Sequence, residues 1–383
     1  MRSIETKSPY LTVMLPVYNG QDYLAQAIES VLSQPCEDLE VLILDDGSKD
    51  NTKKIAQKYV KQDPRVRLLS HENVGLGQNR NLGYTYVRGE WLVFLDHDDV
   101  MFPGIYTEAL LSSLTKCEEF GIEMIVNSRV RGNEHLSDLH FDRIKTNGLF
   151  PSGSQESWNI PFELATNLYS SDLIMRNNIL FSTTRPEMES IFRHKCAYLA
   201  NHVMFCNQGF IEIRRMNDSQ ITNNWNKLHM RAVRLAEYAK LPQWHSQHGD
   251  DAGAVNQAYR ILSGTIVEFF DDAVRSGTSV EDIQGLLYDN EVDKEILIPN
   301  DNYTISANSM IRLYHNKYFL LMKVFATIRG LIRLSRRGFV ASFHINRNIV
   351  RVTCAQLAAV SRNYPTAIRR ILAHAEKEKR NSN

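Results

Sequence analysis

The chain has 383 residues, which is enough for two domains or for one domain with a large extension. Its 43% hydrophobic and 23% charged residues are typical of a globular protein, and its five Cys lack paired spacings such as C-x-x-C, which argues against a disulfide framework or a zinc site. The N-terminus has no signal-peptide pattern and no run of about 18 apolar residues occurs, so we expect a cytoplasmic protein without membrane spans.

The net charge is zero, but the charge is unevenly distributed. Residues 311–383 contain 15 Lys and Arg against two acids, a net charge of +13, so residues 1–310 carry −13. Such a contrast indicates that the C-terminal segment has its own partner or surface role.

The first hundred residues alternate between strand and helix patterns. Short apolar runs that end in polar residues predict strands at 11–19, 39–48, 66–73 and 90–99. Helical spacing of apolar residues predicts helices at 20–34, 50–62 and 75–89, the second with Asp50 or Asn51 as its N-cap. Strands joined by single helices imply right-handed crossovers and a parallel sheet, whose strands all end at one ligand-binding edge.

The chain beyond residue 100 is less regular. We expect, in order, a helix at 105–116, a strand at 121–130, a polar loop at 132–160, a strand and helix within 164–181, a helix at 186–203 and, within 209–222, a strand that runs into a polar loop. From residue 226 onward the pattern is mostly helical. The sequence therefore predicts an α/β domain at 1–225 and a mainly helical C-terminal region at 226–383, strongly basic from 311.

The stretch "FLDHDDV" places Asp96, Asp98 and Asp99 directly after a buried strand. Clustered carboxylates repel one another unless a cation lies between them. We expect Asp98 or Asp99 to take some part in capping a following helix, but capping explains only one acid. A divalent cation, Mn²⁺ or Mg²⁺, explains the group better, because such ions take oxygen ligands and bridge protein carboxylates to substrate phosphates.

Two further segments fit a phosphate-bearing ligand at the same edge. Asp45 and Asp46 end the second strand, where either could accept hydrogen bonds from a base or ribose, although D-D-G-S is equally a turn sequence. "GLGQNRNLG" offers backbone N–H groups at a helix start, with Arg80 for phosphate charge. Its glycine spacing matches neither a dinucleotide-binding fingerprint nor a P-loop, so a dehydrogenase or P-loop kinase fits poorly.

These motifs together resemble the inverting family 2 glycosyltransferases with a GT-A fold, a Rossmann-like sheet flanked by helices. The resemblance covers roughly residues 10–220 and is carried by residues 13–20, 44–52, 72–83, 89–99 and, less clearly, 175–181. It implies a nucleotide-sugar donor and a divalent metal. It places Pro16 and Tyr18 beside the nucleotide's base, Asp46 in contact with that base, Arg80 near the diphosphate, Asp96 near the ribose and Asp98 on the metal. His97, the variable residue of the D-x-D motif, is not expected to be a ligand.

The catalytic base is where the sequence departs from the family. Members carry Glu-Asp on a helix, and that Asp is the expected base, whereas this chain has Glu189 followed by Ser190. We favour Glu189 as the base, with Glu187 as the alternative; both could instead be solvated acids at a helix start. The departure also admits a degenerate member that binds a nucleotide-sugar or scaffolds a complex.

The resemblance extends more weakly to a later Arg-rich strand. It makes Arg214, Arg215 and Ser219 candidates close to the donor and acceptor sites, and the polar segment 132–160 a candidate acceptor loop.

The basic C-terminal segment has two interpretations. Four arginines share one face of a helical pattern that is otherwise apolar: Arg329, Arg333, Arg336 and Arg337. A basic amphipathic helix can lie on an anionic membrane. Alternatively, its apolar face packs on the catalytic domain or on another subunit. Nucleic acid is not an expected partner, because no recognised binding fold is present.

The sequence therefore favours a metal-dependent inverting glycosyltransferase, of hexosyltransferase type, that uses a UDP-sugar. By analogy with the family, the acceptor would be a glycan or lipid-linked glycan in surface polysaccharide or lipopolysaccharide assembly, at or near the cytoplasmic face of the membrane. A nucleotidyltransferase is the other enzyme class considered. It would need a basic Gly-rich loop after the first strand, which "PVYNGQD" does not supply.

Overall fold

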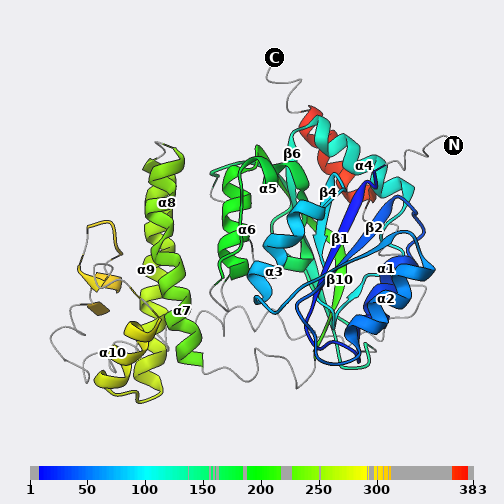
Figure 1. Ribbon diagram of the computed structural model, residues 1–383. Coiled ribbons are helices and arrows are strands. Elements are labelled where there is room, and N and C mark those ends of the chain that lie inside the picture. Colours follow the sequence, from blue (N-terminus) through cyan, green and yellow to red (C-terminus); the bar gives the residue numbers. More distant parts are fainter. Residues whose placement is uncertain are drawn as a thin grey trace. The chain divides into compact units, whose positions relative to one another are not determined.

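The computed structural model describes residues 8–377 except 137, 155–156, 158–159, 161–163, 184–187, 217–226, 250–251, 291, 293–296, 300, 305, 309 and 312–364. The described residues form two compact units (Figure 1). The first draws on Met1–Thr183, Phe192–Asp218 and Ile349–Asn383, and the second on Thr184–Ile191 and Ser219–Asn348.

The first unit is built on a ten-stranded sheet with strand order β3-β2-β1-β4-β9-β6-β10-β5, with β7 paired to β6 and β8 paired to β10. Its strands are β1 (Leu11–Val17), β2 (Leu39–Asp45), β3 (Val66–Ser70), β4 (Trp91–Phe94), β5 (Val100–Met101), β6 (Ile122–Gly132), β7 (His140–Asp142), β8 (Gly148–Pro151), β9 (Leu168–Ser170) and β10 (His202–Arg215). Its helices are α1 (Leu24–Leu32), α2 (Thr52–Gln62), α3 (Leu76–Gly83), α4 (Glu108–Glu119) and α5 (Ser171–Arg176), with 3₁₀ turns η1 (Tyr84–Tyr86) and η2 (Leu164–Thr166). Helix α6 (Met188–Leu199) is divided: its residues up to Ile191 belong to the second unit and those from Phe192 to the first.

Strands β1 to β4 form the expected parallel part of the sheet. Every residue of β1, β2 and β4 is buried, because helices cover both faces of a parallel sheet and leave no solvent-facing side. Single helices connect these strands, as the alternation of patterns predicts. The mostly parallel sheet flanked by helices is thus confirmed, and antiparallel pairing enters only with the short strands β5 and β7 to β9.

The segment 132–160, expected to be a loop, also contains strands. β7 pairs antiparallel with the end of β6, and β8 pairs with the first residues of β10. The expected strand within 209–222 begins earlier, at His202. Strands of three or four residues have too little periodicity to be read locally, since their pairing comes from the neighbours they meet in the sheet.

The acids after β4 do not cap a helix, contrary to expectation. The next element is β5, which pairs with β10, and α4 begins only at Glu108. The cap of α4 is Thr107, whose Oγ1 accepts a hydrogen bond from the Leu110 amide at 3.2 Å. Helix capping therefore explains none of the acids in "LDHDD".

The second unit is helical, as expected from residue 226 onward. It contains α7 (Lys227–Ala239), α8 (Leu241–His248), α9 (Ala252–Arg275) and α10 (Val280–Asp289). Its core is apolar and includes Leu235, Ile266, Phe269, Phe270 and Ile283.

Residues 365–377 form a helix that belongs to the first unit, although the sequence grouped them with the C-terminal region. Ile368 and Leu372 are buried in the core of the α/β unit, whereas Arg369 and Arg370 are exposed. For this helix the apolar face packs on the α/β domain. The arginines at 329–337 lie outside the described residues. No helix within the described ranges is long and apolar enough to cross a membrane.

Candidate active site

The parallel register brings the polar strand ends together, as predicted. Val17 at the end of β1 pairs with Asp45 at the end of β2, and Met14 of β1 pairs with Phe94 of β4. The residues that follow these strands therefore share one edge of the sheet. This edge carries Tyr18 and Asn19, Asp45 and Asp46, and the acids between 96 and 99.

Pro16 and Tyr18 differ in what they offer a ligand at this edge. Pro16 is buried within β1, beyond the point where pairing with β4 ends, so its missing N–H leaves no ladder bond unmade. Tyr18 is 45% exposed on the following loop. Of the two residues expected to border a base, Tyr18 is the one with an open aromatic surface.

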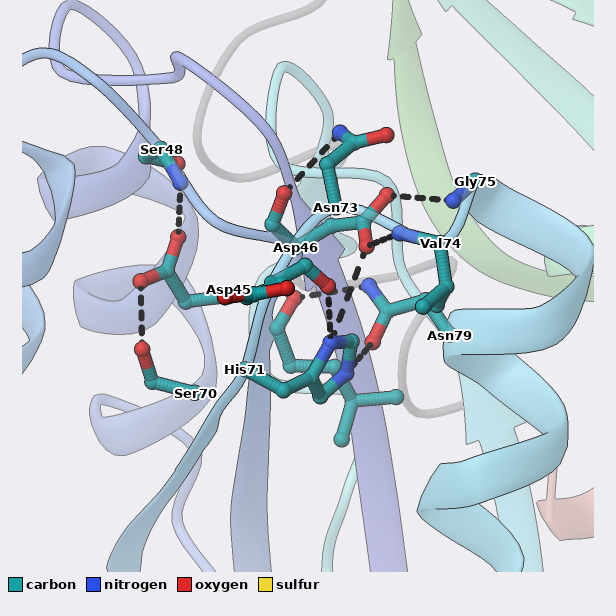
Figure 2. A network of polar contacts seen from close by, with 11 residues as sticks. Asp45, Asp46, Ser48, Ser70, His71, Asn73, Val74, Gly75 and Asn79 are labelled. Atoms are coloured by element: carbon teal, nitrogen blue, oxygen red, sulfur yellow. Dashed lines mark hydrogen bonds and ion pairs between the residues drawn. The ribbon is translucent and has the colours of Figure 1, made fainter.

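Asp46 is held inside a network of polar contacts (Figure 2). Its Oδ1 accepts a hydrogen bond from the Val74 amide at 2.8 Å, and its Oδ2 accepts one from the Gly75 amide at 3.0 Å. Its main-chain oxygen accepts from Asn73 Nδ2 at 2.9 Å. Only 2% of Asp46 is exposed. The carboxylate thus fixes the loop between β3 and α3, and its expected contact with a base stays a prediction.

Two residues that the sequence interpretation did not single out complete this network. His71 Nε2 lies 3.0 Å from Asn79 Oδ1, and Asn79 Nδ2 donates to the Leu44 main-chain oxygen at 3.0 Å. His71 Nδ1 lies 3.8 Å from Asp46 Oδ1. The signal that could have found them is their position, since both flank the glycines that start α3, where a buried polar side chain needs partners.

Arg80 is buried under the edge, and its partner is Asp96. The guanidinium donates to Asp96 Oδ1 at 2.9 Å, although Arg80 is 1% exposed and the Asp96 side chain 42% exposed. The rings of Phe181 and Phe94 lie 5.1 and 5.7 Å from the guanidinium carbon. Aromatic faces and one carboxylate thus accommodate a buried cation. A contact of Arg80 with a diphosphate stays a prediction.

Arg215 of β10 holds Asp98 and Asp99 by hydrogen bonds. The Arg215 amide donates to Asp99 Oδ1 at 2.7 Å, and its Nε donates to the Asp98 main-chain oxygen at 2.7 Å. The same side chain reaches Gln26 Oε1 at 2.6 Å and lies over the Tyr23 ring. Burial raises the pKa of Asp99 well above its ordinary value, and the Asp98 and Asp96 carboxylates raise it further. Arg215 thereby fixes the loop through the Asp99 carboxylate and the Asp98 main chain, and the Asp98 side chain is half-buried.

His97 packs against the loop after β1. A Cβ built on Gly20 would lie 2.4 Å from the His97 ring, so only glycine allows this approach. The contact joins the loop that carries Tyr18 to the loop that carries Asp98.

The donor set at this edge fits a hard divalent cation that is shared with a substrate. Within the described ranges no group of three or more His, Cys, Asp or Glu side chains is arranged to hold a metal by itself. Mg²⁺ and Mn²⁺ commonly take one or two protein carboxylates and complete their shell with substrate phosphates and water. Asp98, with Asp96 beside it, offers carboxylates of that kind.

The proposed bases are less well defined. Glu189 lies in the first turn of α6 and is half-buried. Glu187 and Ser219 lie outside the described residues, and Arg214 precedes Arg215 on β10. The assignment of the base therefore stays a prediction.

Comparison with known proteins shows what the chain is similar to. The model of "Glycosyl transferase family 2" matches residues 12–165, which contain the whole strand edge described above. The glycosyltransferase GlyG of Streptococcus pneumoniae is 26% identical over 226 residues, covering 55% of this chain and 73% of that protein. The chondroitin synthase of Escherichia coli is 40% identical over 95 residues, covering 25% of this chain and 14% of that protein.

Among solved structures, TarS of S. aureus, residues 1–349 in complex with UDP-GlcNAc, superimposes with a TM-score of 0.59. The match covers 86% of this chain and 92% of that chain at 16% identity. At that identity the likeness shows the fold, which confirms the expected GT-A architecture with its helical C-terminal region.

Proposed function

Because the chain is a family 2 glycosyltransferase, we propose that it transfers a sugar from a UDP-sugar to a glycan acceptor, with inversion at the anomeric carbon. The observation that supports the proposal is the gathering of Tyr18, Asp96 and Asp98 at one edge of the parallel sheet. The structural neighbour TarS binds UDP-GlcNAc, which supports UDP as the nucleotide.

In this proposal each residue at the sheet edge contacts a different part of the nucleotide-sugar donor. The exposed ring of Tyr18 offers a face to the base, and Asp96 lies where it can accept hydrogen bonds from the ribose. Arg80 holds Asp96 in place and adds positive charge beneath the diphosphate site. Asp98 would hold a divalent cation, which when bound would neutralise charge on the departing diphosphate.

The transfer requires a base as well as a donor site. A bond forms between the acceptor hydroxyl oxygen and the anomeric carbon while the bond to the diphosphate oxygen breaks, and the hydroxyl proton passes to a carboxylate. We assign that carboxylate to Glu189, with Glu187 as the alternative. Inversion follows from attack on the face opposite the leaving diphosphate.

The acceptor is proposed to be a glycan or a lipid-linked glycan. The similarity to chondroitin synthase supports a glycan. The +13 charge of residues 311–383 supports association with an anionic membrane surface, where lipid-linked acceptors lie. Within the described part of that segment, Arg369 and Arg370 are exposed and available for such a surface.

The test is a thermal-shift screen of UDP-, GDP-, CMP- and dTDP-sugars, each with and without Mn²⁺. Ligand binding to the folded state raises the melting temperature, because it stabilises that state by an amount that grows with the logarithm of ligand concentration over Kd. We expect one UDP-sugar to stabilise the wild type only with metal, and Asp98→Asn to abolish the effect. If no nucleotide-sugar stabilises the protein with or without metal, the proposed function is wrong. Binding without transfer to any acceptor would instead favour the degenerate, non-catalytic alternative that Ser190 leaves open.

A further inference from the structure

His71 occupies a position in which both ring nitrogens face hydrogen-bond acceptors (Figure 2). Nδ1 lies 2.7 Å from the main-chain oxygen of Glu72, and Nε2 lies 3.0 Å from Asn79 Oδ1. The Asp46 carboxylate is 3.8 Å from Nδ1. The His71 side chain is 20% exposed, so solvent cannot replace all of these contacts.

The orientation of the Asn79 amide is fixed by a second contact. Its Nδ2 donates to the Leu44 main-chain oxygen at 3.0 Å, so turning the amide over would place two oxygens together. Asn79 Oδ1 must therefore face His71, and the Glu72 carbonyl can only accept. A neutral imidazole has one N–H donor, whereas this setting provides two acceptors. The setting matches a doubly protonated ring.

The positive charge of a doubly protonated His71 would face Asp46, the residue that holds the loop at 73–75. Asp46 holds the Val74 and Gly75 amides. Residues 73–75 pack so closely on the turn that follows β2 that a Cβ on Gly47 would lie 2.7 Å from the Asn73 nitrogen. Gly47 has φ +72°, which glycine adopts without strain. The exposed Val74 side chain is carried by this loop. Losing the ring proton would remove one hydrogen bond and the charge that faces Asp46.

The charged groups around the ring are few. Within the described ranges, Asp46, the residue after β2, is the charged side chain within ion-pair distance of the ring, while α3 contributes the neutral Asn79. Asp45, on the same strand end, is engaged elsewhere: it accepts from the Ser48 amide at 3.1 Å and from Ser70 Oγ at 2.9 Å. The protonation of His71 therefore bears directly on Asp46 and its loop.

We propose that protonated His71 is a positioning residue for the donor site, so that nucleotide-sugar affinity falls when the ring loses its proton. This inference rests on the proposed function, because it assigns the loop held by Asp46 to donor binding. It concerns affinity and not the chemical step, since His71 touches Asp46 and Asn79 and not the acids at 96–99.

The test measures the Kd of UDP-GlcNAc by calorimetry across the range in which histidines titrate, about pH 5.5 to 8.5. A nucleotide-sugar is preferred over UDP as the ligand, because the terminal phosphate of UDP itself titrates at about pH 6 and would mask the pH dependence that comes from His71. If the screen above selects another nucleotide-sugar, that compound replaces UDP-GlcNAc. For wild type we expect Kd to rise about tenfold towards the alkaline end, the equivalent of one lost charged hydrogen bond.

The variant is His71→Gln, whose amide can donate towards one acceptor but carries no charge. It should bind UDP-GlcNAc about tenfold more weakly at acidic pH, with a flat pH profile and with kcat unchanged at saturating donor. The control is His374→Gln on the C-terminal helix, an exposed histidine outside the network, which should keep the wild-type profile.

Each outcome decides the inference. A flat wild-type profile overturns it, and this result needs no variant, so it holds even if His71→Gln does not fold. A His71→Gln profile equal to that of wild type, or a fall in kcat with Kd unchanged, also overturns it. If wild type binds no nucleotide-sugar at any pH, the proposed function itself fails and the inference fails with it, a result distinct from binding without pH dependence.

Discussion

Arg80 and Asp96 form an ion pair that joins the buried side of α3 to the open edge of the sheet. The guanidinium lies 2.9 Å from Asp96 Oδ1, and one partner is buried while the other is largely open to solvent. An acid of the proposed donor site is thereby oriented by a buried cation. This arrangement gives Arg80 a structural role that does not depend on any contact with a diphosphate.

We expect Arg80→Lys to lower both stability and donor affinity. Lysine lacks the planar guanidinium that lies over the rings of Phe94 and Phe181, and its ammonium is more strongly hydrated. Because Asp96 is partly exposed, the loss of unfolding free energy should be moderate, about 1–3 kcal/mol. Urea unfolding and the donor KM measure the two effects. Arg88→Lys, an exposed arginine nearby in sequence, is the matched control, and equal behaviour of the two variants would contradict the role of Arg80.

Arg215 supports the acidic loop through several contacts at once, so its removal should cost more than that of any one partner. Arg215→Met should lower the unfolding free energy by about 2–3 kcal/mol, because the Asp98 carbonyl loses a buried donor. Gln26→Ala removes one of the contacts and should cost about 1 kcal/mol. The Mn²⁺ concentration needed for donor binding should rise with Arg215→Met. A graded loss between the two variants supports this account, and equal losses refute it.

The sequence carried enough information to predict which strand ends share one edge of the sheet. Apolar runs followed by polar residues mark the ends of β1, β2 and β4, and the parallel topology then brings Tyr18, Asp46 and Asp98 to one edge. This succeeded because a strand buried on both faces has a strong signal and because crossover connections have a fixed hand.

The partners of those residues could not be predicted from the sequence. That Asp46 binds the Val74 and Gly75 amides depends on the path of a loop, which hydrophobic periodicity does not encode. Strand β5 has two residues and shows no pattern, so a helix was expected to follow the acids and one of them to take some part in capping it. The packing of residues 365–377 into the first core is a contact over more than a hundred residues of chain, and local propensity does not report such contacts.

The pairing of β7 with β6 predicts a stability that depends on pH. Burial raises the pKa of Asp142, but the hydrogen bonds and charges of Arg131 and Arg129 together lower it by more. The pKa of Asp142 is therefore below its ordinary value. A lowered pKa in the folded state stabilises the fold above the unfolded value of about 3.9, and this contribution is lost as the pH falls through the folded pKa. Asp142→Asn should therefore be about 1 kcal/mol less stable than wild type near pH 7.

That difference should begin to shrink below about pH 4, where the unfolded chain takes up the proton, and should disappear as the pH falls through the lowered pKa of the folded state. Melting temperatures of the two proteins at pH 7, 5 and 3.5 measure it. Asp138→Asn changes an exposed acid of the same segment and should match wild type throughout. A constant difference between wild type and Asp142→Asn at all three values would show that packing, and not charge, holds β7 in place.

The last prediction concerns the base. Glu189 lies in the first turn of α6, where an acid complements the helix dipole whether or not it takes part in catalysis, so stability cannot separate the two roles. Glu189→Gln keeps the size of the side chain and removes its proton-accepting carboxylate. If Glu189 accepts the acceptor proton, kcat should fall by about 10²- to 10⁴-fold while donor Kd stays near that of wild type. Glu187→Gln is the matched comparison. A fall in kcat for Glu187→Gln alone would identify Glu187 as the base in place of Glu189. Unchanged transfer in both variants would show that neither glutamate is the base.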